Sequence, residues 1–191
     1  MERRFFELKA DMYVKGRWYL SDPADSDGRE IDDIWQFTEG RQVELSERLR
    51  IPIYRPGEPL DIEFAGSGNT PIVSERVATI FRDMAPDDVQ LFPVTVDGRS
   101  EPYFLLNVAR MIRCIDDAAC REVQFFTADE ELHAHRAGEY RYVAGLRIDK
   151  SKVGDARVFR LWGWYLPIIL DEEIKDALEA NGIFGGKFEE V

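Results

Sequence analysis

The sequence predicts an α+β fold built mainly from antiparallel sheet, with two helices at about residues 73–84 and 172–181. Several segments rich in β-branched and aromatic residues follow one another with short turns between them. Short connections favour antiparallel pairing, because parallel strands need a long crossover. Two other segments show the helical spacing of apolar residues, with capping residues at their ends.

The first 64 residues mix short strand-like pieces with acidic turns. RFFEL, RWYL and LRIPIY have the composition of strands, whereas SDPADSDG is typical of a loop, since proline fixes φ, glycine frees it and aspartate binds its own backbone. The glycine-rich segment AGSGNTP at 65–71 is the best candidate for a boundary. We expect one domain over residues 1–191, and a division into lobes at 1–64 and 71–191 is the alternative.

The first predicted helix begins after that boundary. Ser74 is placed to cap its start, Glu75 suits the positive end of the helix dipole, and Pro86 lies just past its end. Its apolar residues fall on one face: Val73, Val77, Ile80, Phe81 and Met84.

The following segments predict strands. Pro93, within the first of them, cannot donate to a ladder, which indicates an edge strand or a bulge. A last short strand, GKFEEV, is expected to rejoin the sheet. The longer candidates are VQLFPVTV (89–96), YFLLNVARMIRCI (103–115), YRYVAGLRI (140–148) and RVFRLWGWYLPIIL (157–170).

The second predicted helix has the clearest local signals. Asp171 is its expected N-cap, and acidic residues follow in the first turn. Asn181 and Gly182 give a left-handed stop, after which Ile183 is placed to contact Leu178 as in a Schellman motif.

Composition narrows the range of functions. In 191 residues, 37 acidic side chains against 25 basic ones give a net charge of −12. This charge repels nucleic acid and anionic membranes and attracts basic partners, so we expect neither nucleic-acid nor membrane binding. MERRFFELKADMY lacks the apolar run of a secretory signal, and LWGWYLPIIL is too short to cross a bilayer, so a cytoplasmic protein is expected.

The two cysteines, Cys114 and Cys120, match no metal or redox motif. Their spacing is not Cys-x-x-Cys, and no second pair completes a tetrahedral site. Buried thiols that act as small hydrophobes in a reducing cytosol are the better interpretation. The role of Cys120 stays open.

His133 and His135 are the only histidines. On a strand, alternate positions would share one face, where Glu130 or Glu131 would complete a metal site and support a small metal-assisted enzyme. The flanking charges favour an exposed loop instead, so we expect no metal and no cofactor.

No catalytic motif stands out. AGSGNTP lacks the lysine and the Ser/Thr of a phosphate loop, and neither Gly-x-Ser-x-Gly nor His-Glu-x-x-His occurs. A regulatory module that binds a small molecule near Gly66 and Gly68 has no support beyond the glycines themselves.

The tryptophans allow two interpretations. Trp162 and Trp164 alternate around Gly163, which predicts that they share one face of a strand with Tyr165 opposite. Core packing is the default for such a pair, and a partner-facing groove is the alternative.

Six segments together are similar to those of a known family: DMYVKGRWYLSDPADSDGREIDDIWQFTEGR, PIVSERVATIF, DDVQLFPVTV, YFLLNVARMIRCID, LRIDKSKVGDARVFRLWG and DEEIKDALEANGIFGGKFEEV. They resemble an immunity-protein family of bacterial polymorphic toxin systems, immunity protein family eleven. The resemblance implies a non-enzymatic protein that binds and neutralises a cognate toxin delivered between cells, and it brings no catalytic residues. It also implies that NVARMIRCID is a core strand in which Cys114 packs.

A toxin that acts on nucleic acid is expected to be basic, and an acidic inhibitor would attract it. Solvated acidic loops without a partner are the alternative for any one patch. The candidate partner-binding residues are Asp22, Asp25, Asp27, Asp32, Asp33, Trp35, Asp129, Glu130 and Glu131.

Overall fold

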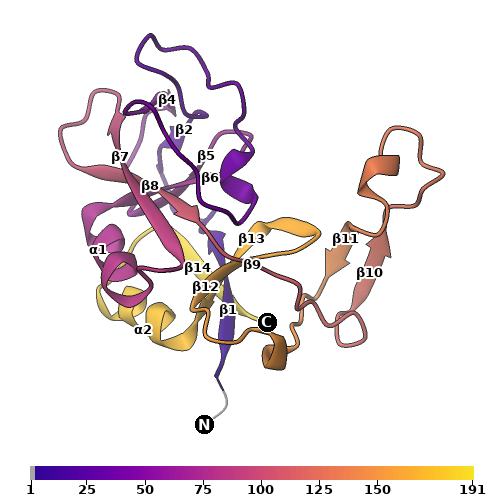
Figure 1. The fold of residues 1–191 in the computed structure, drawn as a ribbon. Coiled ribbons are helices and arrows are strands. Elements are labelled where there is room, and N and C mark those ends of the chain that lie inside the picture. The colour runs from indigo at the N-terminus through magenta and orange to yellow at the C-terminus, as the bar shows by residue number, and fades with distance from the viewer. Residues whose placement is uncertain (1–2) are drawn as a thin grey trace.

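Two five-stranded sheets form the body of the protein, which confirms the predicted α+β class. The structure, a computed structural model, describes residues 3–191. Most neighbouring strands are antiparallel, and only the short pairs β3–β7 and β12–β9 are parallel among the described residues. We call the two sheets the terminal sheet and the middle sheet, after the parts of the chain that form them (Figure 1).

The terminal sheet has the order β14 (Gly186–Glu190), β1 (Phe5–Ala10), β13 (Trp164–Asp171), β12 (Val158–Leu161), β9 (Met111–Ile112). The middle sheet has the order β3 (Arg50–Ile51), β7 (Val89–Val96), β8 (Tyr103–Val108), β6 (Thr70–Ser74), β5 (Ile62–Ala65). The helices are α1 (Glu75–Met84) and α2 (Glu172–Ala180), with short 3-10 turns η1 (Gln36–Thr38), η2 (Ala134–Arg136) and η3 (Lys150–Lys152).

Both sheets bury apolar side chains on both faces. Successive residues of a strand point to opposite faces, so one strand feeds two cores. In β13, Ile168 and Leu170 enter the core that the two sheets share with both helices, and Ile169 enters a second core. In β8, Leu106 faces the shared core and Leu105 faces a third core under the N-terminal loops.

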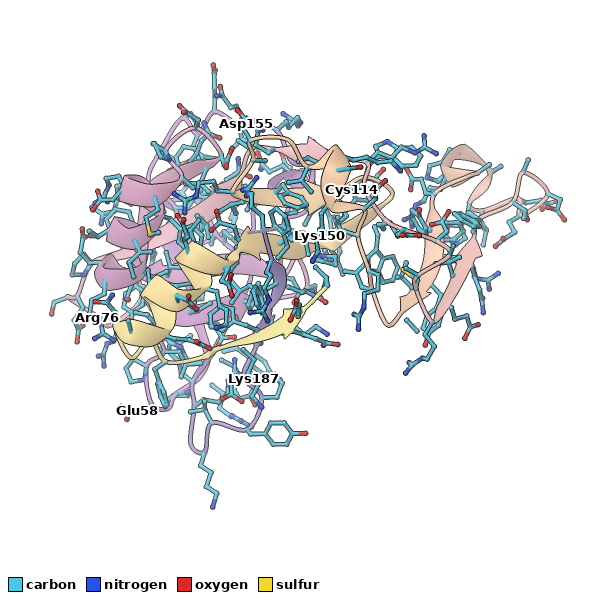
Figure 2. All side chains as sticks on the ribbon, turned by 90° about the horizontal axis from the view of Figure 1, so that it is seen from below. Glu58, Arg76, Cys114, Lys150, Asp155 and Lys187 are labelled. Carbon is cyan, nitrogen blue, oxygen red and sulfur yellow. The ribbon has the colours of Figure 1, made fainter. Side chains whose placement is uncertain are left out.

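Two shorter strand pairs complete the fold. β2 (Tyr19–Leu20) pairs with β4 (Ile53–Arg55) beside the third core. β10 (Glu122–Phe125) pairs with β11 (Tyr140–Ala144), and these strands with their connecting loop extend away from the body in both views (Figures 1 and 2). We call residues 116–147 the arm. None of the helices in residues 3–191 combines the length and apolar character that a membrane crossing requires.

The first helix starts two residues later than its apolar spacing indicates. Val73 belongs to β6, and Ser74 makes no capping hydrogen bond with its side chain. The Ser74 hydroxyl instead donates to Asp61 Oδ1 at 2.6 Å, so tertiary contacts have taken over the expected cap. Val77 and Phe81 are fully buried, as predicted.

The second helix matches its local signals. The Asp171 carboxylate accepts the amide hydrogen of Ile174 at 3.0 Å, which is the predicted cap. Gly182 has a φ of 60°, and the Ile183 amide donates to the Leu178 carbonyl at 3.2 Å, as a Schellman motif requires. The predicted last strand also rejoins the sheet, as β14 beside β1.

Two predicted long strands are wrong because each is interrupted. Residues 103–115 leave the middle sheet after β8, where the Ala109 amide donates to Asp88, and enter the terminal sheet as β9. Residues 157–170 form the hairpin β12–β13, which turns at Gly163 with a φ of 78°. Trp162 therefore lies in a turn rather than on the strand that carries Trp164.

The glycine-rich segment 65–71 forms the turn between β5 and β6, which pair with each other. Asp22 holds this turn, because its carboxylate accepts the amide hydrogens of Ser67 and Gly68 at 2.8 Å each. The middle sheet therefore contains strands from both sides of the segment. Pro93 lies on β7 beyond the two-residue pairing with β3, which fits the predicted edge position.

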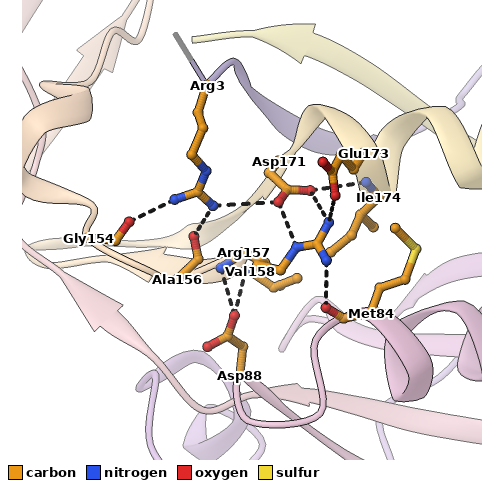
Figure 3. Close-up of polar contacts among 10 residues, drawn as sticks. All are labelled: Arg3, Met84, Asp88, Gly154, Ala156, Arg157, Val158, Asp171, Glu173 and Ile174. Atoms are coloured by element: carbon orange, nitrogen blue, oxygen red, sulfur yellow. Dashed lines mark hydrogen bonds and ion pairs between the residues drawn. The ribbon is translucent and has the colours of Figure 1, made fainter. Parts of the chain in front are cut away.

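A network of charged side chains joins the two sheets and both helices (Figure 3). Besides capping α2, Asp171 accepts from Arg157 Nε at 2.7 Å, and it pairs with Arg3 at 3.5 Å. Arg157 also donates to the Met84 carbonyl at the end of α1, at 3.1 Å. The Asp88 carboxylate accepts the amide hydrogens of Arg157 and Val158, so the connection from α1 into β7 is tied to β12.

We expect Asp171→Ala to lower the free energy of unfolding by about 3 kcal/mol, because it removes a cap and leaves a partly buried guanidinium without its main partner. Glu173→Ala is the matched control, since Glu173 pairs with the same Arg157 at 2.6 Å but is 76% exposed. It should cost less than about 1 kcal/mol. Urea unfolding measures both, and equal losses would contradict this account of the network.

Candidate functional site

A groove of about 1020 Å³ lies between the arm and the body. Three segments far apart in sequence form most of it: the stretch around η1, the β12–β13 hairpin and the arm, and Met111 of β9 adds to the lining. Its lining residues are Trp35, Thr38, Glu39, Arg41, Met111, Phe126, His135, Arg136, Glu139, Tyr140, Arg141, Trp162, Trp164, Tyr165 and Leu166. We call this cavity the groove.

The body side of the groove carries three tryptophans. Trp35 precedes η1 and remains 48% exposed, while its backbone is fixed because its amide donates to Asp33 Oδ1 at 3.0 Å. Trp162 and Trp164 stand on either side of the hairpin turn at Gly163, and both line the groove. Trp164 also packs against the second core, as the core interpretation expects, so the pair combines core packing with a place in the groove, and the two do not share one strand.

The arm side is held to the body by hydrogen bonds from tyrosines. The Tyr165 hydroxyl donates to Glu139 Oε1 at 2.6 Å, and the Tyr140 amide donates to the Gly163 carbonyl at 3.1 Å. Within the arm, the Tyr140 hydroxyl donates to Asp117 at 2.6 Å. Burial, together with the bond to Glu139, raises the pKa of Tyr165 to about 12. Glu139 also accepts from Arg136 Nε at 2.8 Å. These contacts fix the orientation of the arm and the width of the groove.

Arg160 lies under the floor of the groove. Its guanidinium is fully buried and donates to the carbonyls of Phe37, Tyr165 and Leu166, two of which belong to lining residues. Burial lowers the pKa of Arg160 to about 9, so the side chain is still charged at neutral pH. The residue therefore joins η1 to β13 and places a positive charge beneath the groove.

An acidic cleft of about 360 Å³ lies on the other side of η1. Trp35 lines the groove and the next residue, Gln36, lines the cleft, so the two cavities share this turn. Among the described residues that line the cleft there is no lysine or arginine. Its carboxylates belong to Asp25, Glu30, Asp32, Asp33, Glu44 and Glu47.

The predicted partner-binding residues are therefore divided among several places. Asp25, Asp32 and Asp33 line the cleft, and Trp35 lines the groove. Asp22 supports the β5–β6 turn and Asp27 pairs with Arg29 at 3.4 Å, so neither lines either cavity.

The second predicted acidic segment lies in the loop of the arm. Glu130 accepts from Thr127 and pairs with Arg141 at 3.3 Å. Hydrogen bonding from Thr127 holds the pKa of Asp129 below its usual value, and Glu131 is exposed.

Sequence reasoning missed the arm side of the groove, including Arg136, Glu139 and Arg141. The signals that pointed to this cavity were Trp35 and the spacing of Trp162 and Trp164, and Tyr165, expected on the opposite face, lines the groove as well. Residues from the arm and the body come together only through tertiary packing, so no local pattern identifies them as a set.

The histidines do not occupy a strand, which corrects the geometry on which a metal site depends. His133 precedes η2 and packs against the Phe126 ring at 5.1 Å, whereas His135 lines the groove. Within residues 3–191, no group of three or more His, Cys, Asp and Glu side chains is placed to hold a metal ion.

Both cysteines are buried free thiols in the second core. Burial raises the pKa of Cys114 to about 12 and also raises that of Cys120. Cys120 Sγ accepts the Arg147 amide hydrogen at 3.3 Å, so this thiol helps to hold the base of the arm. Figure 2 shows Cys114 close to the point where the arm meets the body.

Comparison with known proteins gives one family. A family model described as an immunity protein family (Imm11) matches residues 9–191. No curated protein matches the chain.

We expect both thiols of the folded protein to resist modification by a disulfide reagent at pH 8. A pKa of about 12 lowers the thiolate fraction of Cys114 at that pH roughly a thousandfold relative to an unperturbed thiol. Cys120, at 9% exposure against 0%, should react first. The variants Cys114→Ala and Cys120→Ala show which rate of modification belongs to which thiol. Rapid labelling of Cys114 in the folded protein would show that this thiol is not packed as described.

Proposed function

The chain belongs to the Imm11 family of immunity proteins, and from this premise we propose that it neutralises a cognate toxin by binding it at the groove and the acidic cleft. Protection then comes from covering the working surface of the toxin rather than from a chemical reaction. The observation that carries the proposal is the composition of the groove, where tryptophan, tyrosine and arginine side chains gather around one cavity.

These three residue types dominate the energetics of protein interfaces, since each combines a large contact area with a polar group. Trp35 has the form of an anchor, because its side chain is half exposed while its backbone is fixed by Asp33. An anchor that is already held in position loses little conformational freedom on binding.

The distribution of exposed apolar side chains supports the same surface. Residues 3–191 include nine large hydrophobic residues that are exposed, and five of them lie on the arm or in the groove. Monomeric proteins seldom gather such residues in one region unless it binds something. The five are Trp35, Phe125, Leu132, Tyr142 and Leu166.

The acidic cleft adds long-range attraction for a basic partner. Its carboxylates lie next to the groove on a protein with a net charge of −12. A partner with positive charge is drawn toward this side, which raises the association rate more than it raises the final affinity. In this proposal the cleft speeds association with the toxin, and the aromatic groove slows its dissociation.

We expect Trp35→Ala to weaken binding of the toxin encoded beside this gene by about 2 kcal/mol, or roughly thirtyfold in Kd. Tyr54→Ala is the control, because Tyr54 is 80% exposed on β4 and lies outside the groove. Calorimetry measures the affinity, and co-expression in a sensitive host measures protection. Equal effects of the two variants would remove the groove from the proposal.

Neutralising the cleft should slow association about tenfold at low salt and flatten its salt dependence, with little change in dissociation. The triple variant Glu30→Gln, Asp32→Asn, Glu44→Gln is suitable, because the hydrogen bonds among residues 3–191 do not involve these side chains. Asp25, Asp33 and Glu47 accept backbone amide hydrogens and are left intact.

The control for this experiment is Glu75→Gln, Asp83→Asn, Asp87→Asn on and after α1, which makes the same change in net charge at another place. Stopped-flow kinetics over a range of salt concentrations compares the two variants. If both slow association equally, the net charge and not the cleft steers the toxin.

A further inference from the structure

The groove differs in sign from the protein that carries it. Three arginines line it, Arg41, Arg136 and Arg141, against two glutamates, while the whole chain carries −12. The acidic cleft on the other side of η1 has carboxylates only. Two neighbouring cavities of opposite sign therefore share one turn of the chain.

Both groove glutamates are already engaged. Glu39 pairs with Arg41, and Glu139 accepts hydrogen bonds from Arg136 and from the Tyr165 hydroxyl. The pair between Arg141 and Glu130 is long, at 3.3 Å, and the arginine is 56% exposed, so the pair is weak. The carboxylates of the groove are thus not free to receive a basic side chain.

Two further cations lie next to lining residues. The Arg113 guanidinium stacks over the Trp162 ring at 4.0 Å, and Arg160 is buried beneath Tyr165 and Leu166. Within residues 3–191 neither makes an ion pair with a carboxylate. Arg113 is exposed, so water screens its charge, whereas the charge of the fully buried Arg160 acts over a longer distance than a charge in water.

From these observations we propose that the groove binds an acidic segment of the toxin in which a carboxylate stands beside an aromatic side chain. The inference rests on the proposed function and names the partner of its site. The aromatic group packs among the exposed faces of Trp35 and Trp164, and the carboxylate pairs with Arg41 or Arg141 on the rim. A planar guanidinium receives a carboxylate in two parallel hydrogen bonds, which favours arginine at such a site.

A basic segment fits the groove poorly, because the lining glutamates are already paired and, within residues 3–191, the nearby Arg113 and Arg160 have no carboxylate partner. Nucleic acid is also anionic and aromatic, but it would have to approach a protein of net charge −12 with the acidic cleft beside the groove. A toxin that carries both a basic region and an acidic aromatic segment matches both cavities. In a single docking orientation, its basic region would face the acidic cleft and its acidic segment would face the groove.

Fluorescent peptides test the proposal with the intact protein. One probe alternates Asp and Trp, a second alternates Lys and Trp, a third alternates Asp and Ser, and a fourth probe is a short single-stranded oligonucleotide. We expect the Asp/Trp peptide to bind at least about tenfold more tightly than each of the others, as measured by fluorescence anisotropy at low and moderate salt. Tighter binding of the Lys/Trp peptide or of the oligonucleotide, or no binding of the Asp/Trp peptide, would overturn the proposal.

Two variants locate the binding. Arg41→Gln together with Arg141→Gln should weaken binding of the Asp/Trp peptide about tenfold, whereas Arg29→Gln, at a more exposed arginine outside the groove, should not. Arg160 is left intact, since its removal would disturb the fold. If the double variant binds the peptide like the unaltered protein, the groove arginines do not recognise it and the proposal is wrong.

Competition separates this proposal from the proposed function. The Asp/Trp peptide should displace the toxin, and the double variant should lose affinity for both. If the toxin binds through Trp35 but the peptide neither binds nor competes, the acidic partner is wrong and the proposed function remains. If the peptide binds and the toxin does not, the proposed function fails and the groove keeps its ligand chemistry.

Discussion

The structure depends on the hydrogen-bond acceptors of two arginines, Arg157 just before β12 and Arg160 within it. A guanidinium removed from water needs acceptors for its hydrogens, and the chain must be arranged to supply them. Just before β12, Arg157 meets Asp171 and the end of α1, which joins both helices to the terminal sheet. Within β12, Arg160 meets the carbonyls of Phe37, Tyr165 and Leu166, which joins η1 to the same sheet.

These anchors also determine where a partner can bind. Apolar packing covers most of both faces of the two sheets, which leaves little of them for recognition. The surface available for recognition lies at the margins of the sheets, on the loops around η1, the tip of the β12–β13 hairpin and the arm. The groove forms where these three margins meet, and Arg160 fixes two of them relative to each other. Recognition therefore lies on loops that a rigid body positions.

The sequence predicts what local chemistry determines. Asp171 and Gly182 mark α2, and the run 89–96 marks β7, because caps and strand composition act over a few residues. The interruptions at Ala109 and Gly163 depend on which sheet each segment joins, and composition carries no such information. The groove could not be predicted as a site for the same reason, and the buried Arg160 resembles any arginine in a strand.

The place of β1 in the terminal sheet has a consequence for how the protein is made. Residues 5–10 lie between β13 and β14, so the first strand can pair only after residues 164–190 have been made. A sheet closed by such distant segments forms slowly, because the intervening chain must first be brought together. Synthesis of the early residues therefore leaves open strand edges until residues 164–190 have been made. A chain that stops before β14 would leave one edge of β1 without its partner.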